Sequence, residues 1–168
     1  MKDVKIDEKK YRDKLFETFR YFILICEKHN LKYFCAGGTI IGAVRHKGII
    51  PWDDDIDVFM PIDDYRKLYG LIPSMNKDGF NFISALNSRQ ATFGKLYNMN
   101  TTLWELKQIP FLYGVYVDIF PLVETDETEK VFMNKYRNLR NLFRKYQLAQ
   151  MKFTLSDIVE CYKEGERS

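Results

Sequence analysis

The chain has few of the residues that build disulfide or zinc sites. Its 168 residues include three cysteines and two histidines, and no two cysteines form a Cys-x-x-Cys pair. Structural zinc usually needs about four closely spaced thiolate or imidazole ligands, so a zinc cluster is not expected. An odd, scattered set of cysteines also argues against a disulfide framework. We therefore expect reduced, packed thiols in a cytoplasmic protein.

Long apolar runs are also absent. The longest uncharged stretch, from Tyr33 to Val44, is far shorter than the roughly 20 apolar residues of a membrane-spanning helix. Five of the first eight residues are charged, where a secretory signal would be apolar. No transmembrane segment is therefore expected.

The positive and negative charges of the chain nearly balance. Lysine and arginine number 26 and aspartate and glutamate 23, which leaves a net charge of +3. A nucleic-acid-binding domain usually carries a larger basic excess, so no nucleic acid partner is expected. What the chain does have is core-forming material, because 46% of its residues are hydrophobic. This excludes a long disordered chain and favours one folded domain with a helical appendage.

The hydrophobic pattern predicts helices interspersed with short strands. Helical spacing covers residues 8–29, 39–44, 62–71 and 127–150. Strand-like segments cover residues 33–36, 55–60, 80–84, 92–97 and 115–120, and prolines are expected to end two of them. This order predicts an α+β fold, a mixed β-sheet flanked by helices, with a core over residues 1–125 and a helical extension over residues 126–168.

The most informative acids stand at the start of one strand-like segment. Side chains alternate along a strand, so Asp55 and Asp57 are expected on one face, with Asp53 extending that face into the loop. Carboxylates held this close repel one another unless a cation neutralises them, which favours a metal site over a solvated acidic turn. An EF-hand is rejected, because Val58 stands where its loop needs glycine.

Two further features support a phosphate and metal site. Gly37-Gly38-Thr39 lies between a predicted strand and helix, where exposed N–H groups attract phosphate, although glycine pairs often only make turns. The Walker and dinucleotide-binding patterns are both absent. Asp118 lies in an apolar strand, where an ionised group is costly unless it is paired, so a ligand role is favoured over a hydrogen bond to backbone.

Together these motifs resemble a known family. The sequences GGTIIGAVRHKGIIPWDDDID at residues 37–57 and YVDIFP at residues 116–121 are similar to the two landmarks of LicD-type phosphotransferases, a family that includes fukutin and fukutin-related protein. The resemblance covers roughly residues 8–125. It implies a nucleotidyltransferase-like fold in which Asp55, Asp57 and Asp118 are catalytic and bind Mg²⁺, with Mn²⁺ as an alternative.

The resemblance also implies the reaction. Its members take a CDP-linked alcohol such as CDP-choline and pass the phospho-alcohol to a hydroxyl of a glycan, releasing CMP. The expected partners are therefore a CDP-activated donor and a glycan or lipid-linked glycan acceptor, such as lipopolysaccharide or teichoic acid. Two alternatives stay open: a nucleotidyltransferase that moves NMP from an NTP, and a non-catalytic nucleotide-binding remnant.

The substrate-binding residues expected in this context share a chemistry suited to phosphate or to the reacting groups. They are Gly37, Gly38, Thr39, Arg45, His46, Asp53 and Lys95. Arg45 can clamp a phosphate with two hydrogen bonds, and His46 can bond a phosphate or the acceptor hydroxyl. Lys95 is a secondary candidate for the donor phosphate. Trp52 is expected to pack against the fold, with stacking on a base or sugar as the alternative.

The predicted C-terminal helix is strongly basic. It carries Lys130, Lys135, Arg137, Arg140, Arg144, Lys145 and Lys152 without an intervening acid. We expect these residues to form a solvated face. The alternative is peripheral contact with an anionic membrane surface, which would place the protein at the inner face of the membrane.

Overall fold

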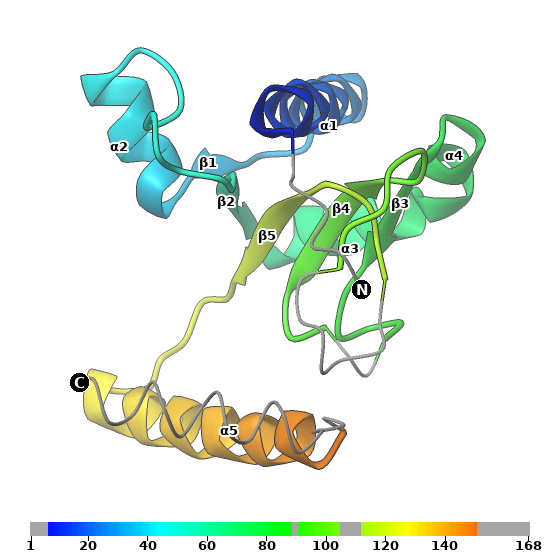
Figure 1. Ribbon diagram of the computed structural model, residues 1–168. Coiled ribbons are helices and arrows are strands. Elements are labelled where there is room, and N and C mark those ends of the chain that lie inside the picture. The colour runs from blue at the N-terminus through cyan, green and yellow to red at the C-terminus, as the bar shows by residue number, and fades with distance from the viewer. Residues whose placement is uncertain (1–6, 89–90, 105–111, 151–168) are drawn as a thin grey trace, which may run out of the picture. The chain divides into compact units, whose positions relative to one another are not determined.

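The fold is a mixed sheet with helices, as the sequence predicts. A computed structural model describes residues 7–88, 91–104 and 112–150 (Figure 1). The elements, in chain order, are α1 (Glu8–Lys28), β1 (Phe34–Cys35), α2 (Gly37–Arg45), β2 (Asp57–Pro61), α3 (Ile62–Gly70), α4 (Ile72–Lys77), β3 (Phe80–Ile83), β4 (Gly94–Asn98), β5 (Tyr116–Leu122) and α5 (Glu129–Gln150). The α+β prediction is therefore confirmed.

The sheet brings segments together that are far apart in the sequence. Its five strands lie in the order β1-β2-β5-β4-β3. The pair β2–β5 is parallel, and the other three pairs are antiparallel. The two strands that carry the sequence landmarks, β2 and β5, are therefore direct neighbours at the centre of the sheet.

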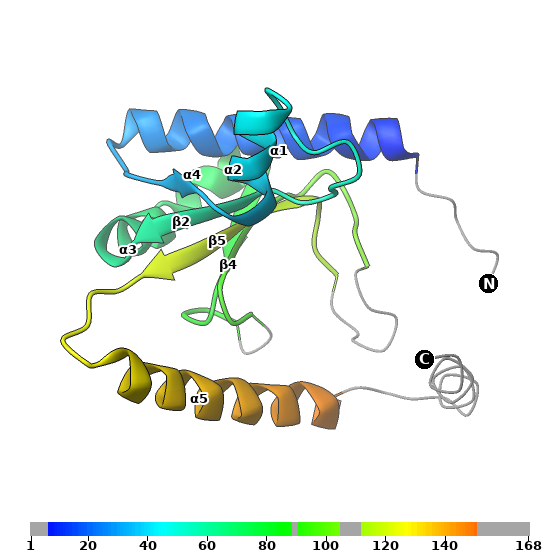
Figure 2. The ribbon, with the colours of Figure 1, turned by 90° about the vertical axis from the view of Figure 1, so that its left-hand side faces the viewer.

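One face of the sheet holds the hydrophobic core. Figure 2 shows α1 running along this side of the sheet. Its fully buried residues Leu15 and Phe22 belong to the same core cluster as Val58 of β2, Leu96 of β4 and Val117 of β5. Asp7 caps the start of α1, because its carboxylate accepts a hydrogen bond from the backbone N–H of Lys10.

Proline does not end β5 at the expected place. The strand continues through Pro121 to Leu122, and Pro121 pairs in register with Met60 of β2. The N–H of Asp118 donates to the carbonyl of Ile56, so alternate residues of β5 donate toward β2. Proline has no N–H, but an N–H at residue 121 would point away from β2, toward β4. The pairing with β4 has already ended at Ile119, so no hydrogen bond of the sheet is lost.

Two other boundaries also differ from the prediction. β2 begins at Asp57 and not at Asp55, so strand alternation does not place the Asp55 side chain. The single helix predicted over residues 62–71 is followed by a second short one, α4, which Pro73 helps to start because proline suits the first turn of a helix.

α5 belongs to a second compact unit and is described here by itself. Its basic side chains from Lys130 to Lys145 are exposed, which fits both a solvated face and contact with a membrane surface, so the solvated face stays a prediction. Lys152 lies outside the described residues. The division at residues 125 and 126 into core and extension stays a prediction. Over the described part of the chain, no helix combines the length and apolar character needed to cross a bilayer.

Candidate active site

Three charged residues form a row across the outer face of the sheet, opposite the core. Asp57 of β2 pairs in register with Asp118 of β5, and Asp118 pairs with Lys95 of β4. Side chains of paired residues lie on the same face, and the adjacent residues Val58 and Val117 are fully buried on the core face. The two landmark motifs therefore meet at Asp57 and Asp118.

The start of α2 fits closely around the acidic residues. Gly37 has a φ of +50°, and a Cβ atom there would lie 2.9 Å from Oδ2 of Asp57. A Cβ atom on Gly38 would clash with the carboxylate of Asp53. The hydroxyl of Thr39 accepts a hydrogen bond of 2.8 Å from the N–H of Asp57. The glycine pair thus lets two carboxylates approach the first turn of a helix.

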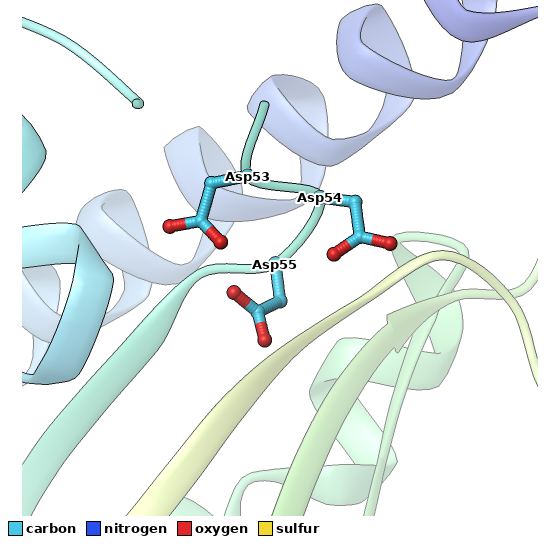
Figure 3. A group of neighbouring side chains, drawn as sticks. All are labelled: Asp53, Asp54 and Asp55. Carbon is cyan, nitrogen blue, oxygen red and sulfur yellow. The ribbon is translucent and has the colours of Figure 1, made fainter. Parts of the chain in front are cut away.

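A second group of acids lies just before β2. Asp53, Asp54 and Asp55 each offer a carboxylate oxygen, and these oxygens lie within 4.8 Å of one another. Figure 3 shows the three side chains grouped at the bend that leads into the strand. The sequence prediction singled out Asp53 and Asp55 but not Asp54, because Asp54 was not on the expected strand face. The run of three consecutive acids was the signal that could have included it.

The electrostatics of these acids favour a bound cation. Burial raises the pKa of Asp55 to about 6, and the negative charges of Asp57, Asp53 and Asp54 add to the effect. Burial also raises the pKa of Asp57, helped by Asp53 and partly opposed by the positive charge of Lys95. Carboxylate oxygens are the ligands that Mg²⁺ prefers, and a divalent cation would remove the repulsion between them. The donor set therefore fits Mg²⁺ or Mn²⁺.

The raised pKa of Asp55 predicts a pH-dependent stability of the metal-free protein. The folded protein holds this proton more tightly than the unfolded chain, so ionising Asp55 destabilises the fold as the pH rises from 3.8 through about 6. We expect Asp55→Asn to raise the free energy of unfolding by about 1 kcal/mol at pH 8, allowing for solvent screening, with little effect below pH 4. Urea denaturation at both pH values, with Asp63→Asn on α3 as the control, measures this. An equal effect at both pH values would contradict it.

α1 anchors the acidic loop to the fold. The hydroxyl of Tyr11 donates a hydrogen bond of 2.9 Å to the carbonyl of Asp54, and the guanidinium of Arg12 donates to the carbonyl of Pro51. Both bonds hold the backbone of the loop from outside. These two bonds could not be predicted from the sequence, because the partners are separated by about 40 residues and the acceptors are backbone groups.

The tyrosine anchor can be tested by removing one hydroxyl. We expect Tyr11→Phe to lower the free energy of unfolding by about 1 kcal/mol and the Mn²⁺ affinity by about tenfold. Tyr21→Phe is the matched control, because Tyr21 also lies on α1 and donates a 2.9 Å hydrogen bond, but to Asp78. Loss of the Tyr21 hydroxyl should lower the free energy of unfolding and leave the Mn²⁺ affinity unchanged. Calorimetric titration with Mn²⁺ distinguishes the two, and equal affinities in both variants would exclude an anchoring role for Tyr11.

Asp118 already has a partner inside the protein. Oδ1 of Asp118 lies 2.8 Å from Nζ of Lys95, and each side chain is only about a tenth exposed, at 11% and 12%. The sequence prediction took the burial of this acid in an apolar strand as a sign of a ligand role. The ion pair with Lys95 already accounts for the burial of Asp118. What supports a metal-binding role for Asp118 is therefore its pairing with Asp57 on the neighbouring strand.

Arg45 and His46 lie at the opposite end of α2 from the glycine pair. They stand at the C-terminal end of α2, about 12 Å of helix away from Gly37. Their predicted contact with a donor phosphate stays a prediction and requires a ligand that reaches this end of the helix. Trp52 is 80% exposed. Its ring packs edge-on against that of His46, with 5.9 Å between the ring centroids. The expectation that Trp52 packs against the fold was therefore wrong.

The fold and the two paired acids, Asp57 and Asp118, define an α+β protein with a carboxylate site on its parallel strands β2 and β5. Comparison with known proteins agrees with the sequence resemblance. The profile of the family described as LicD/FKTN/FKRP, nucleotidyltransferase domain, matches residues 30–155, well over half of the chain. The chain belongs to this family.

Individual relatives match over different lengths. The lipopolysaccharide cholinephosphotransferase LicD of Haemophilus influenzae is 32% identical over 131 residues, which cover 73% of this chain and 48% of that protein. An uncharacterized protein of Rickettsia prowazekii is 43% identical over 53 residues, 32% of this chain and 20% of that protein. The human ribitol 5-phosphate transferase FKRP is 42% identical over 50 residues, 30% of this chain and 10% of that protein. The chain thus spans about half the length of the first relative and less of the other two.

Proposed function

We propose that this protein is a divalent-cation-dependent phosphotransferase that moves a phospho-alcohol from a CDP-linked donor to a glycan hydroxyl. Relatives named as cholinephosphate and ribitol phosphate transferases support the reaction class. The observation that carries the proposal is the register of Asp57 with Asp118 beside the glycine pair of α2. A phosphoanhydride needs positive charge on its oxygens before it breaks, and this arrangement can hold that charge.

In this proposal Asp55, Asp57 and Asp118 hold Mg²⁺ or Mn²⁺, with Asp53 and Asp54 at the rim of the site. The cation, when bound, offsets negative charge on the donor pyrophosphate. In the same proposal, the N–H groups at the start of α2 and the Lys95 ammonium would bind oxygens of the donor phosphates. The acceptor hydroxyl attacks the phosphorus that carries the alcohol, the bond to CMP breaks, and a carboxylate of the acidic group takes the hydroxyl proton.

A product assay tests the proposed reaction. The full chain is incubated with CDP-choline or CDP-ribitol, Mg²⁺ and a panel of envelope glycans, and CMP is measured. We expect CMP release that depends on donor, cation and acceptor together. Release of pyrophosphate from an NTP, in place of CMP from a CDP-alcohol, would instead identify a nucleotidyltransferase. Tight nucleotide binding without either product would identify a binding remnant.

A further inference from the structure

Among the described residues, one carboxylate and three aromatic rings surround the ammonium group of Lys95. Nζ lies 2.8 Å from Oδ1 of Asp118 and 3.5 Å from the ring centroid of Tyr116. The rings of Phe93 and Tyr113 lie at 5.2 and 5.5 Å. Aromatic faces attract a cation, and the effect is strongest where water is largely excluded. The surroundings of Nζ thus suit a single positive charge.

This positive charge acts on both acids of the row. Lys95 pairs in register with Asp118, which in turn pairs with Asp57, so the three side chains follow one another across β4, β5 and β2. The charge of Lys95 also lowers the pKa of Asp57, against the larger effect of burial. In the metal-free protein, Lys95 therefore offsets part of the charge that a divalent cation would offset.

A cation held between Asp57 and Asp118 has to share a carboxylate with this lysine. The side chain of lysine has a flexible four-carbon stem and makes no bidentate contact, so Nζ can leave Asp118 without moving β4. Any approach of a divalent ion to Oδ1 adds repulsion from the ammonium at 2.8 Å. The divalent cation and Lys95 therefore compete for Asp118.

On the basis of the cation site proposed above, we propose that Lys95 is the resident counter-ion of Asp118, competes with the divalent cation for this carboxylate and so sets the affinity of the site. Metal binding displaces the ammonium, which then faces the ligand side of the sheet. Lys95 is in this sense a positioning residue, because it acts on the cation through Asp118.

The test is a titration of the full chain with Mn²⁺ alone, by calorimetry. We expect Lys95→Met to bind Mn²⁺ about tenfold more tightly than the wild type, since one repelling charge is removed. The same variant should melt at a lower temperature without metal, because the buried Asp118 carboxylate loses the positive charge 2.8 Å away, and should gain more from added Mn²⁺. Lys95→Arg keeps the charge and can hold Asp118 with two hydrogen bonds, so it should bind Mn²⁺ no more tightly than the wild type.

A matched control removes a different lysine from an ion pair. Lys67 lies 2.8 Å from Asp64 on α3, and Lys67→Met changes the net charge by the same amount. Its Mn²⁺ affinity should equal that of the wild type. If Lys95→Met does not fold, Lys95→Gln keeps a donor for Asp118 without the charge and carries the same expectation.

The outcomes separate this inference from the proposed function. If the wild type binds Mn²⁺, Asp57→Asn abolishes binding, and neither uncharged Lys95 variant binds more tightly, the competition is refuted while the cation site stands. If the wild type binds no Mn²⁺, or Asp57→Asn binds it unchanged, the cation site and the competition both fail. Tighter binding in Lys67→Met as well would show a general charge effect and would also refute the role of Lys95.

Discussion

Replacing Asp57 by asparagine is expected to lower the rate of CMP release by about 1,000-fold or more, because removing one electrostatic group from a preorganised site already costs about 10²–10³ in kcat. The substitution keeps the size and shape of the side chain beside Gly37 and leaves the N–H bonded to Thr39 unchanged. It removes only the negative charge that a cation needs.

The same variant should fold normally. Burial already disfavours the ionised form of Asp57, so a neutral amide should leave the free energy of unfolding of the metal-free protein unchanged or slightly higher. Asp63→Asn is the control, since Asp63 lies on α3 with its side chain 82% exposed and changes the net charge equally. Activity retained in Asp57→Asn, with activity in Asp63→Asn alongside, would refute the assigned site. A loss of both activity and folding would instead show that Asp57 is structural.

The second large effect is expected at Gly37. With a φ of +50°, alanine at this position costs about 1–2 kcal/mol in backbone strain. Its Cβ atom would also lie 2.9 Å from Oδ2 of Asp57, and the flexible carboxylate would move away from it. Because catalysis depends on the position of this carboxylate, we expect Gly37→Ala to lower CMP release by about 100-fold.

Gly70 supplies the comparison for Gly37. A Cβ atom added there meets no atom within 4 Å, so Gly70→Ala should leave activity unchanged and should not lower the free energy of unfolding. Urea denaturation and the CMP assay are measured on both variants. Full activity in Gly37→Ala, despite the expected loss of stability, would show that the glycine serves the backbone turn and not the position of Asp57.

The parts of the fold that the sequence predicted are those with a strong local pattern. The apolar spacing of Leu15, Phe22 and Cys26 predicted α1, and the alternation around Val58 predicted β2 to within two residues at its start. The boundary at Pro121 was wrong, because the effect of a proline depends on which side of the strand still has a partner. That information is in the pairing of the strands and not in the local sequence.

In the candidate site, too, the residues with a strong local pattern were predicted and the contacts between distant segments were not. The sequence singled out five candidates because unusual residue types stand in otherwise apolar or turn-like segments: Gly37, Gly38, Asp55, Asp57 and Asp118. The anchors from α1 and the pairing between Lys95 and Asp118 were not foreseen. They join residues separated by 23 positions or more, and they follow from the strand order. Lys95 itself was singled out, but its partner was not.

Anomalous diffraction from crystals soaked with Mn²⁺ and CDP-choline shows directly where the cation binds. We expect a manganese peak bound by Asp57 and Asp118, with carboxylate oxygens at about 2.0–2.2 Å and the ammonium of Lys95 moved off Asp118. A peak confined to exposed acids elsewhere, with Lys95 still paired to Asp118, would contradict it.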